Sequence, residues 1–289
     1  MTVFGSRQVF TTNNNISFCT FLYIISNINQ GGAISISGNS VVFELKFSKF
    51  HHCSSMSYSC GSLYCLCHYV IISKVCFYDS QSQNLCSVML SQASFNFLNE
   101  SSMDFCGQNG TKSCAWRQSA GQCYIDSLNC TRCYGIDRES AGHFSYNPPK
   151  TEMKLSFFGS CGGVYVLGPY SPISNHYDCI FYNNTPSIAL FVVWGGNHYI
   201  NHFLFIQNIK TISSTGHANS IIGFIKCIGD QPFVGVQNSL EGSTFTNQIV
   251  TEYQLYLHKC YHEMSIPMYL PRNPGFLLVL FNFCLCRFS

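Results

Sequence analysis

Charged residues are scarce in this chain. They make up 10% of its 289 residues, against roughly 25% in an ordinary soluble domain, and the lysines and arginines are scattered singly. A protein that follows a nucleic-acid backbone needs a concentration of basic residues, so we expect no nucleic-acid partner. The hydrophobic content of 46% still supplies ample material for a core, which leaves Ser, Asn, Thr and Gln to solvate the surface.

Helix signals are also missing. Ala, Glu, Lys and Leu are sparse, and no long stretch keeps a 3.6-residue apolar period between helix caps. Short runs of β-branched and aromatic residues alternate instead with clusters of Asn, Gly and Ser, as at residues 41–47, 164–166 and 221–225. The sequence therefore predicts an all-β protein.

Long apolar segments are absent from both ends. Residues 1–7 lead into three asparagines at 13–15 without the apolar stretch of a signal peptide. The apolar run at 275–286 is shorter than the ~20 residues that span a bilayer as a helix. It fits a truncated anchor, an interfacial segment or a final strand, so membrane association through 275–286 is one expectation. An incomplete fragment of a larger surface protein is a further alternative.

Cysteine, by contrast, is abundant. Eighteen cysteines are spread from Cys19 to Cys286, more than cytosolic enzymes usually carry. Five Asn-x-Ser/Thr acceptors for N-glycosylation also occur, at Asn15, Asn99, Asn109, Asn129 and Asn183. Both features fit a secretory route, which predicts a cell-surface or secreted protein.

A phrase of the form apolar-x-Phe-x-x-polar recurs along the chain. Copies centred on Phe157, Phe181 and Phe205 are spaced by 24 residues. Less regular copies are centred on Phe47, Phe77, Cys130 and Phe245. A repeat period of about 20 to 50 residues is the signature of a solenoid, although a chain with 25 phenylalanines produces some matches by chance.

In a parallel solenoid, equivalent residues of successive coils stack at the ~4.8 Å strand spacing. We therefore predict an interior column of Phe157, Phe181 and Phe205, with Asn184 over Asn208 at a corner. There the amides can bond to each other, and Asn tolerates a left-handed backbone. Cysteine suits inward positions as a small apolar residue, and we expect it there at Cys76, Cys130 and Cys179.

Three glycine pairs predict turns that feed strands, because apolar or aromatic residues follow each pair within a few positions. They are Gly31 with Gly32, Gly162 with Gly163, and Gly195 with Gly196. None has the Gly-x-Gly-x-x-Gly spacing of a dinucleotide site. We predict no cofactor.

Together these patterns predict an all-β parallel solenoid with long loops. We expect an irregular segment at 1–15, the β-helix at 16–260 with a loop-rich insertion around 100–150, and an apolar segment at 261–289.

Two motifs carry a family resemblance. Residues 31–34 read Gly-Gly-Ala-Ile, and Phe181 and Phe205 each begin a Phe-x-x-Asn. They resemble the paired GGAI and FxxN repeats of chlamydial polymorphic outer-membrane proteins and of related large surface-protein families of parasitic protists. The resemblance covers residues 16–210 in broken form. It implies a right-handed parallel β-helix of the pectate-lyase-like kind, exposed at the cell surface and used in adhesion or host contact, without catalysis. We expect its partner to be a protein or a glycan.

Parallel β-helices also include polysaccharide lyases and hydrolases, which cluster carboxylates on one sheet. A carbohydrate-active enzyme is therefore the alternative, although the acids here are scattered along the chain. A zinc site is a second alternative, because thiolate and imidazole suit zinc; its atoms would come from His51, His52, Cys53, Cys60, Cys65, Cys67 and His68. Their spacing matches no zinc pattern, so we favour core or disulfide roles and predict neither metal nor catalytic residues.

Overall fold

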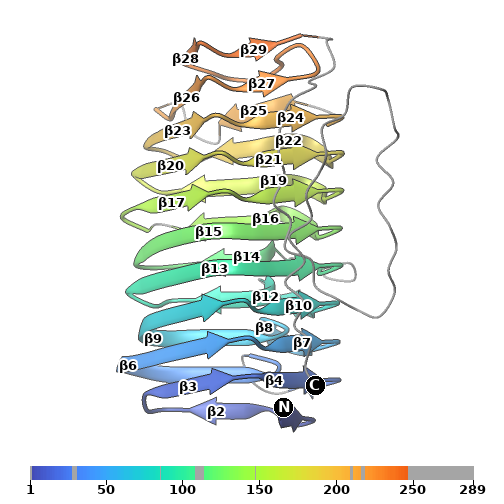
Figure 1. The fold of residues 1–289 in the computed structure, drawn as a ribbon, viewed down its shortest axis with the longest axis vertical. Coiled ribbons are helices and arrows are strands. Elements are labelled where there is room, and N and C mark those ends of the chain that lie inside the picture. The colour runs from blue at the N-terminus through green and yellow to red at the C-terminus, as the bar shows by residue number, and fades with distance from the viewer. Residues whose placement is uncertain are drawn as a thin grey trace.

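The structure, a computed structural model, describes residues 2–27, 31–84, 86–107, 114–146, 148–208, 211–215 and 219–246. These residues form strands and no helix. The strands pair in parallel with the equivalent strands of the next coil. The coils climb from β2 and β3 to β28 and β29 as a right-handed parallel β-helix (Figure 1). The predicted fold class is confirmed.

Each coil contributes to three sheets, named A, B and C here. Sheet A holds β1 (Thr2–Phe4), β4 (Cys19–Leu22), β7 (Lys49–His51), β10 (Cys76–Tyr78), the ends of β13 (Phe95–Asp104) and β15 (Gln122–Thr131), β18 (Phe157–Gly159), β21 (Ile180–Tyr182), β24 (Leu204–Ile206), β27 (Ile228–Gly229) and β29 (Thr244–Phe245). Sheet B holds β3 (Asn14–Ser17), the ends of β6 (Ile34–Lys46) and β9 (Leu63–Ser73), the starts of β13 and β15, β17 (Thr151–Lys154), β20 (Ile173–Tyr177), β23 (Asn197–Asn201), β26 (Ile221–Ile225) and β28 (Ser239–Glu241).

Sheet C holds β2 (Gln8–Phe10), the starts of β6 and β9, β12 (Cys86–Ser91), β14 (Cys114–Gln118), β16 (Tyr134–Tyr146), β19 (Gly162–Tyr170), β22 (Thr185–Val193) and β25 (Thr211–Thr215). A small separate sheet holds β5 (Ile25–Ser26), β8 (Ser54–Ser59) and β11 (Gln81–Asn84). Because strand side chains alternate between faces, every second residue points into the space between the three sheets.

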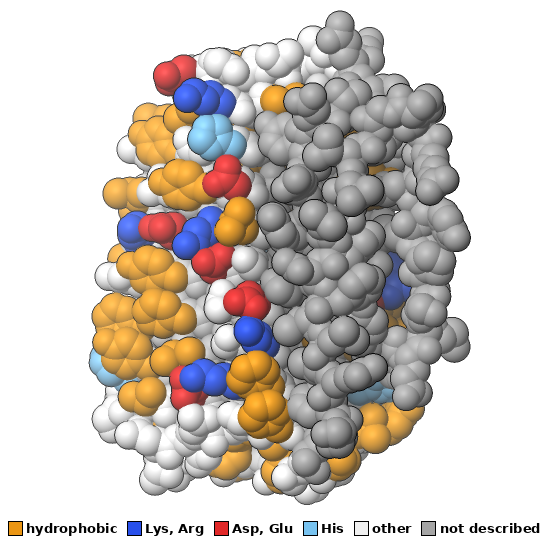
Figure 2. Space-filling model, in the orientation of Figure 1, with side chains coloured by type: hydrophobic (Ala, Val, Ile, Leu, Met, Phe, Trp, Pro, Cys, Tyr) orange, Lys and Arg blue, Asp and Glu red, His pale blue; other side chains and the backbone are white. Residues whose placement is uncertain are grey.

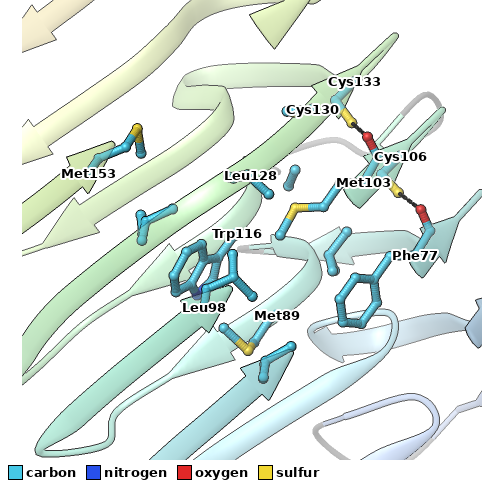
Figure 3. Packing of buried hydrophobic residues seen from close by; sticks show 14 of the residues in the cluster. Phe77, Met89, Leu98, Met103, Cys106, Trp116, Leu128, Cys130, Cys133 and Met153 are labelled. Carbon is cyan, nitrogen blue, oxygen red and sulfur yellow. Dashed lines mark hydrogen bonds between the residues drawn. The ribbon is translucent and has the colours of Figure 1, made fainter. Parts of the chain in front are cut away.

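One interior column runs the length of sheet A, and we call it the phenylalanine column. Its members are in-register partners: Phe4, Phe21, Phe50, Phe77, Met103, Cys130, Phe158, Phe181, Phe205, Gly229 and Phe245. Neighbouring rings stack, with centroids 4.6 Å apart for Phe21 and Phe50 and 5.5 Å apart for Phe181 and Phe205. Side chains of sheets B and C, including Leu98 and Trp116, complete the core (Figure 3).

The register of this column differs from the sequence prediction at two points. Phe158 takes the place expected for Phe157, which pairs with Ile180 on the other side of the strand. Phe50 takes the place expected for Phe47, which lies at a bend. Each correction follows from alternation, since a shift of one residue, or of any odd number, moves a side chain to the opposite face.

Residues with positive φ form two bends in each coil, one on either side of sheet A. The first bend has Phe18, Phe47, Lys74, Glu100, Ser127, Leu155, Asp178, His202 and Lys226, all with φ from 43° to 59°. The second has Tyr23, His52, Asp79, Phe105, Arg132, Ser160, Asn183 and Gln207, with φ from 47° to 56°. Asn184 and Asn208 follow the left-handed residue and do not occupy it, which corrects the expectation that they supply that backbone.

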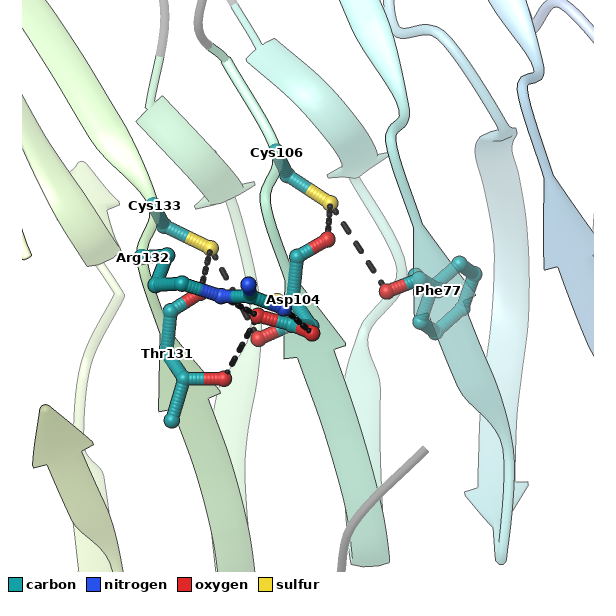
Figure 4. Close-up of polar contacts among 7 residues, drawn as sticks. Phe77, Asp104, Cys106, Thr131, Arg132 and Cys133 are labelled. Carbon is teal, nitrogen blue, oxygen red and sulfur yellow. Dashed lines mark hydrogen bonds and ion pairs between the residues drawn. The ribbon is translucent and has the colours of Figure 1, made fainter. Parts of the chain in front are cut away.

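The residue after the second bend is buried and forms what we call the corner ladder: Cys53, Ser80, Cys106, Cys133, Cys161, Asn184 and Asn208. Its thiols and amides donate to the carbonyl of the phenylalanine column one coil below. Cys106 Sγ lies 3.8 Å from Phe77 O, and Cys133 Sγ lies 3.6 Å from Met103 O (Figure 4). Asn208 Nδ2 makes the same bond to Phe181 O at 2.8 Å. Cysteine and asparagine are thus interchangeable donors at this corner.

Two segments are more regular than expected. Residues 2–15 carry β1, β2 and the start of β3, each paired with the next coil, where an irregular segment was predicted. The region around 100–150 holds the long strands β15 and β16. Both segments are polar and poor in repeats, but backbone pairing with the adjacent coil supplies the order that their side chains do not signal.

Candidate interaction surface

Outward side chains of sheet B form an aromatic surface. In β13, Asn96 and Leu98 are buried, so Phe95 and Phe97 point outward. Strand register places Phe95 beside Tyr69 of the preceding coil, and it places Phe97 between Ile71 and Tyr124 of the two adjacent coils. We call this surface the aromatic face; it consists of Val42, Tyr69 and Phe95 in one column and Ile71, Phe97 and Tyr124 in the next.

The rings of the aromatic face are ordered by stacking between coils. Tyr69 and Phe95 have centroids 4.7 Å apart at an interplanar angle of 10°, and Phe97 and Tyr124 lie 5.3 Å apart at 11°. Phe97 nevertheless remains 37% exposed and Val42 36% exposed. Stacked rings lose little further conformational freedom when a partner covers them, which favours binding.

A charged border runs beside the aromatic face, along the ends of the sheet B strands and the first bend. Lys74 Nζ lies 3.4 Å from Glu100 Oε2, and Lys154 Nζ lies 3.0 Å from Asp126 Oδ2, each pair joining neighbouring coils. The hydrogen bond and charge of Asp126 raise the pKa of Lys154. Figure 2 shows acidic and basic side chains alternating beside hydrophobic ones on the near face.

The border ends in an exposed aromatic pair at the first bend. Phe18 and Phe47 stack with centroids 4.9 Å apart, and Lys74 Nζ lies 5.5 Å from the centroid of Phe47. The exposed ion pairs of the border, such as Lys74 with Glu100, contribute little to stability, typically about 0 to 1 kcal/mol. Their consequence is a surface with a fixed pattern of charge around an apolar centre.

The predicted glycosylation acceptors fall into different environments. Asn15 and Asn183 are exposed, and Asn99 is half-buried. Asn129 is only 5% exposed within β15, so the folded chain has no room for a glycan there. The prediction of Asn129 as a glycosylation acceptor is therefore corrected. Asn109 lies outside the described residues.

The glycine pairs also divide. Gly31–Gly32 precede β6 and Gly195–Gly196 precede β23, as turns that feed strands. Gly162 and Gly163 open β19 instead of forming a turn. Gly163 has φ +105°, and a Cβ there would lie 1.8 Å from Gly135 O. Close contact between coils, and not a reversal of direction, explains this pair.

Several carboxylates of the described sheets are paired with Arg or His side chains. Asp104 bonds to Arg132 and accepts a bond from Thr131 Oγ1 at 2.8 Å (Figure 4). His52 Nδ1 lies 2.5 Å from Asp79 Oδ2, and His202 Nδ1 lies 3.3 Å from Asp178 Oδ1. This arrangement differs from the paired acids of a glycan-cleaving site, in which two carboxyl groups face one bond.

The cysteines and histidines considered for zinc are not brought together. Across the described residues, no group of three or more His, Cys, Asp or Glu side chains is placed to hold a metal ion. Cys53 and Cys65 belong to the core, where burial raises the pKa of the Cys53 thiol to about 12. Inward positions hold Cys130 and Cys179 as expected, but Cys76 is only half-buried because its neighbour Phe77 points inward.

The aromatic face was missed by the sequence reasoning. Its signal is the alternation Phe95-Asn96-Phe97, which reads as outward aromatics only after the inward column is known. The segment 275–286 lies outside the described residues, and no helix in the described part of the chain is long and apolar enough to cross a membrane.

The GGAI and FxxN motifs now have structural places. Gly32 lies against Gly61, where a Cβ would meet the carbonyl oxygen at 1.9 Å. Phe181 and Phe205 belong to the phenylalanine column, and Asn184 and Asn208 belong to the corner ladder. In comparisons with protein-family models, with curated proteins and with solved structures, nothing matches the chain.

Proposed function

We propose that this protein is a non-catalytic β-helix, exposed at a cell surface or secreted, that binds a protein partner through its aromatic face. The observation that carries the proposal is an exposed aromatic centre, built on stacked rings such as Phe97 and Tyr124, beside a border of alternating charge. Exposed apolar patches with polar surroundings mark interaction sites. The GGAI and FxxN resemblance supports a role in adhesion.

A protein fits this surface better than a glycan does. Tyr and Phe are enriched in the core of protein interfaces, with charged residues at the rim. The rings here stack face to face between coils, so they present edges outward, whereas a sugar ring packs on a free aromatic face. Lys74, Glu100, Asp126 and Lys154 would give such a complex its orientation more than its affinity.

The test is binding of the labelled full chain to cultured epithelial cells, with and without prior protease treatment of the cells. We expect saturable binding that protease treatment abolishes. The double variant Phe97→Ser with Tyr124→Ser should weaken it at least tenfold, as expected when interface anchors are lost. Ile188→Ser is the matched control, because Ile188 is 49% exposed on β22 of sheet C.

Several results would overturn the proposal. These are absence of saturable binding, equal binding by the aromatic-face variant and wild type, or binding that glycosidase treatment removes and protease treatment spares. The enzyme alternative is tested separately, by incubating the chain with a panel of polysaccharides and measuring release of reducing ends.

A further inference from the structure

The interior contains a buried polar cluster that the proposed function does not use. We call it the histidine nest, and it consists of Trp116, His143, Thr151, Ser174, His176 and His198, each 0% exposed. Trp116 and His143 come from sheet C, and the other four come from sheet B. The members are linked: the rings of Trp116 and His143 lie 4.6 Å apart, and the electrostatic influence of both His143 and His198 reaches His176. Thr151 pairs in register with Ser174, which bonds to His198.

Local backbone structure aims His143 into the core. Between Ser140 and His143 the pairing of β16 with β19 slips, so that Ala141 and Gly142 on β16 oppose Val166 alone on β19. Ser140 Oγ donates to His143 O at 2.7 Å across this bulge. A bulge redirects a side chain and is retained in folds for that purpose. The inward imidazole is therefore a built feature of sheet C.

Four of the six members of the nest have buried polar side-chain atoms without a protein partner. His198 bonds through both ring nitrogens, to Ser174 Oγ and Gly195 O. In contrast, Nδ1 and Nε2 of both His143 and His176, Trp116 Nε1 and Thr151 Oγ1 are buried without a hydrogen bond from the protein. Each buried polar group without a hydrogen bond costs about 1 to 3 kcal/mol. Several such groups in one cluster therefore favour a bound species that supplies the missing hydrogen bonds.

We propose that the histidine nest is an internal binding site for ordered water, held between sheets B and C by His143, His176, Thr151 and Trp116. The balance of groups favours water over an ion. Each neutral imidazole offers one donor and one acceptor, Trp116 adds a donor, and Thr151 adds one of each. Water carries two donors and two acceptors, so ordered water can bond to groups of both kinds. Burial keeps the pKa of both histidines low, so they stay neutral.

Ions fit this site less well. Among the buried side chains of the described residues there is no carboxylate, lysine or arginine to neutralise an ion. An anion would face unprotonated imidazole nitrogens, and a metal ion would find two imidazoles and one hydroxyl, short of the usual ligand set.

The test uses the full wild-type chain. A crystal structure at atomic resolution should show water hydrogen-bonded to at least two of the orphaned atoms. In solution, nitrogen-15 spectra should show one neutral tautomer each for His143 and His176, with magnetisation transfer from slowly exchanging water. The exposed His202 serves as the control, because it should exchange rapidly.

The variant His143→Phe should remove the water contacts of His176 while leaving the His202 signal unchanged. If this variant does not fold, the wild-type density and spectra decide the question alone. The proposal is overturned if the imidazoles turn to bond protein groups, if no density lies between them, or if elemental analysis finds a stoichiometric metal.

Discussion

Asn184 Nδ2 lies 2.9 Å from Asn208 Oδ1, one coil away, and the same Nδ2 lies 2.9 Å from Phe158 O. Asn184 Oδ1 also accepts a bond from the Cys161 N–H at 2.9 Å. One buried amide therefore joins the coils on both sides of it.

Asn184→Ala should destabilise the fold by about 3 kcal/mol or more, because it leaves buried backbone groups without partners. Asn184→Cys should cost clearly less, since Cys161 shows that a thiol at this position reaches the equivalent carbonyl at 3.5 Å. Urea denaturation measures both. The exposed Asn197→Ala is the control and should stay within about 0.5 kcal/mol; equal losses for the two Asn184 variants would contradict the ladder.

The corner thiols should resist alkylation in the folded state. Cys53 and Cys106 are fully buried, and burial raises the pKa of the Cys106 thiol and raises that of Cys53 to about 12, so reactive thiolate is rare at these two positions at neutral pH. Among the cysteines whose burial the structure describes, mass spectrometry after timed iodoacetamide treatment should show the half-buried Cys76 modified first and Cys53 and Cys106 only in denaturant. Corner cysteines that stay unmodified even in denaturant without reductant would show that they are oxidised.

Stability should fall as the solution becomes acidic. Burial lowers the pKa of His143 to about 3, and it also lowers the pKa of His176 and His198. The unfolded chain binds protons below its own histidine pKa of about 6.5, while the folded chain does not. The stabilisation is therefore complete above about pH 6.5 and is lost as pH falls toward the folded values, by roughly 1.4 kcal/mol per pH unit for each histidine.

Urea midpoints measured from neutral pH down to about pH 4 check this slope. His143→Phe should reduce the slope of stability against pH by the contribution of one histidine. An identical slope for His143→Phe and wild type would show that His143 does not stay neutral in the fold.

Gly163→Ala should prevent cooperative folding or cost more than about 3 kcal/mol. Its φ of +105° disfavours a side chain, and the new Cβ would lie 1.8 Å from Gly135 O. Gly5→Ala is the matched control, because nothing lies within 4 Å of the Cβ position there. Thermal unfolding followed by circular dichroism separates the two, and similar melting curves would disprove the close approach of β16 and β19.

The fold class and the pairing of Phe181 with Phe205 could be predicted because the phrase around Phe181 recurs 24 residues later, which is the length of one coil. Between Phe158 and Phe181 the spacing is 23 residues, so a search for steps of 24 selects Phe157, its neighbour. Two adjacent phenylalanines leave the inward one undefined until strand pairing fixes the register. The same ambiguity placed Phe47 where Phe50 belongs.

The aromatic face and the histidine nest could not be predicted for a different reason. Both depend on which residues of distant coils become neighbours, and coil lengths that vary with loops hide this from the sequence. Tyr69 and Phe95 stack across 26 positions, and His143 meets Trp116 across 27. Asn129 shows that a sequence motif can also mislead, since its glycosylation motif is intact but the side chain is buried in its strand.

The corner ladder also bears on how such a chain can change over time. Six of its positions hold a short side chain that donates to a carbonyl one coil below, and both thiol and amide make this bond. Substitutions between Cys and Asn can therefore accumulate at the very positions that define the repeat. Two β-helices of common descent could drift beyond recognition in sequence while these coils still close with the same bond.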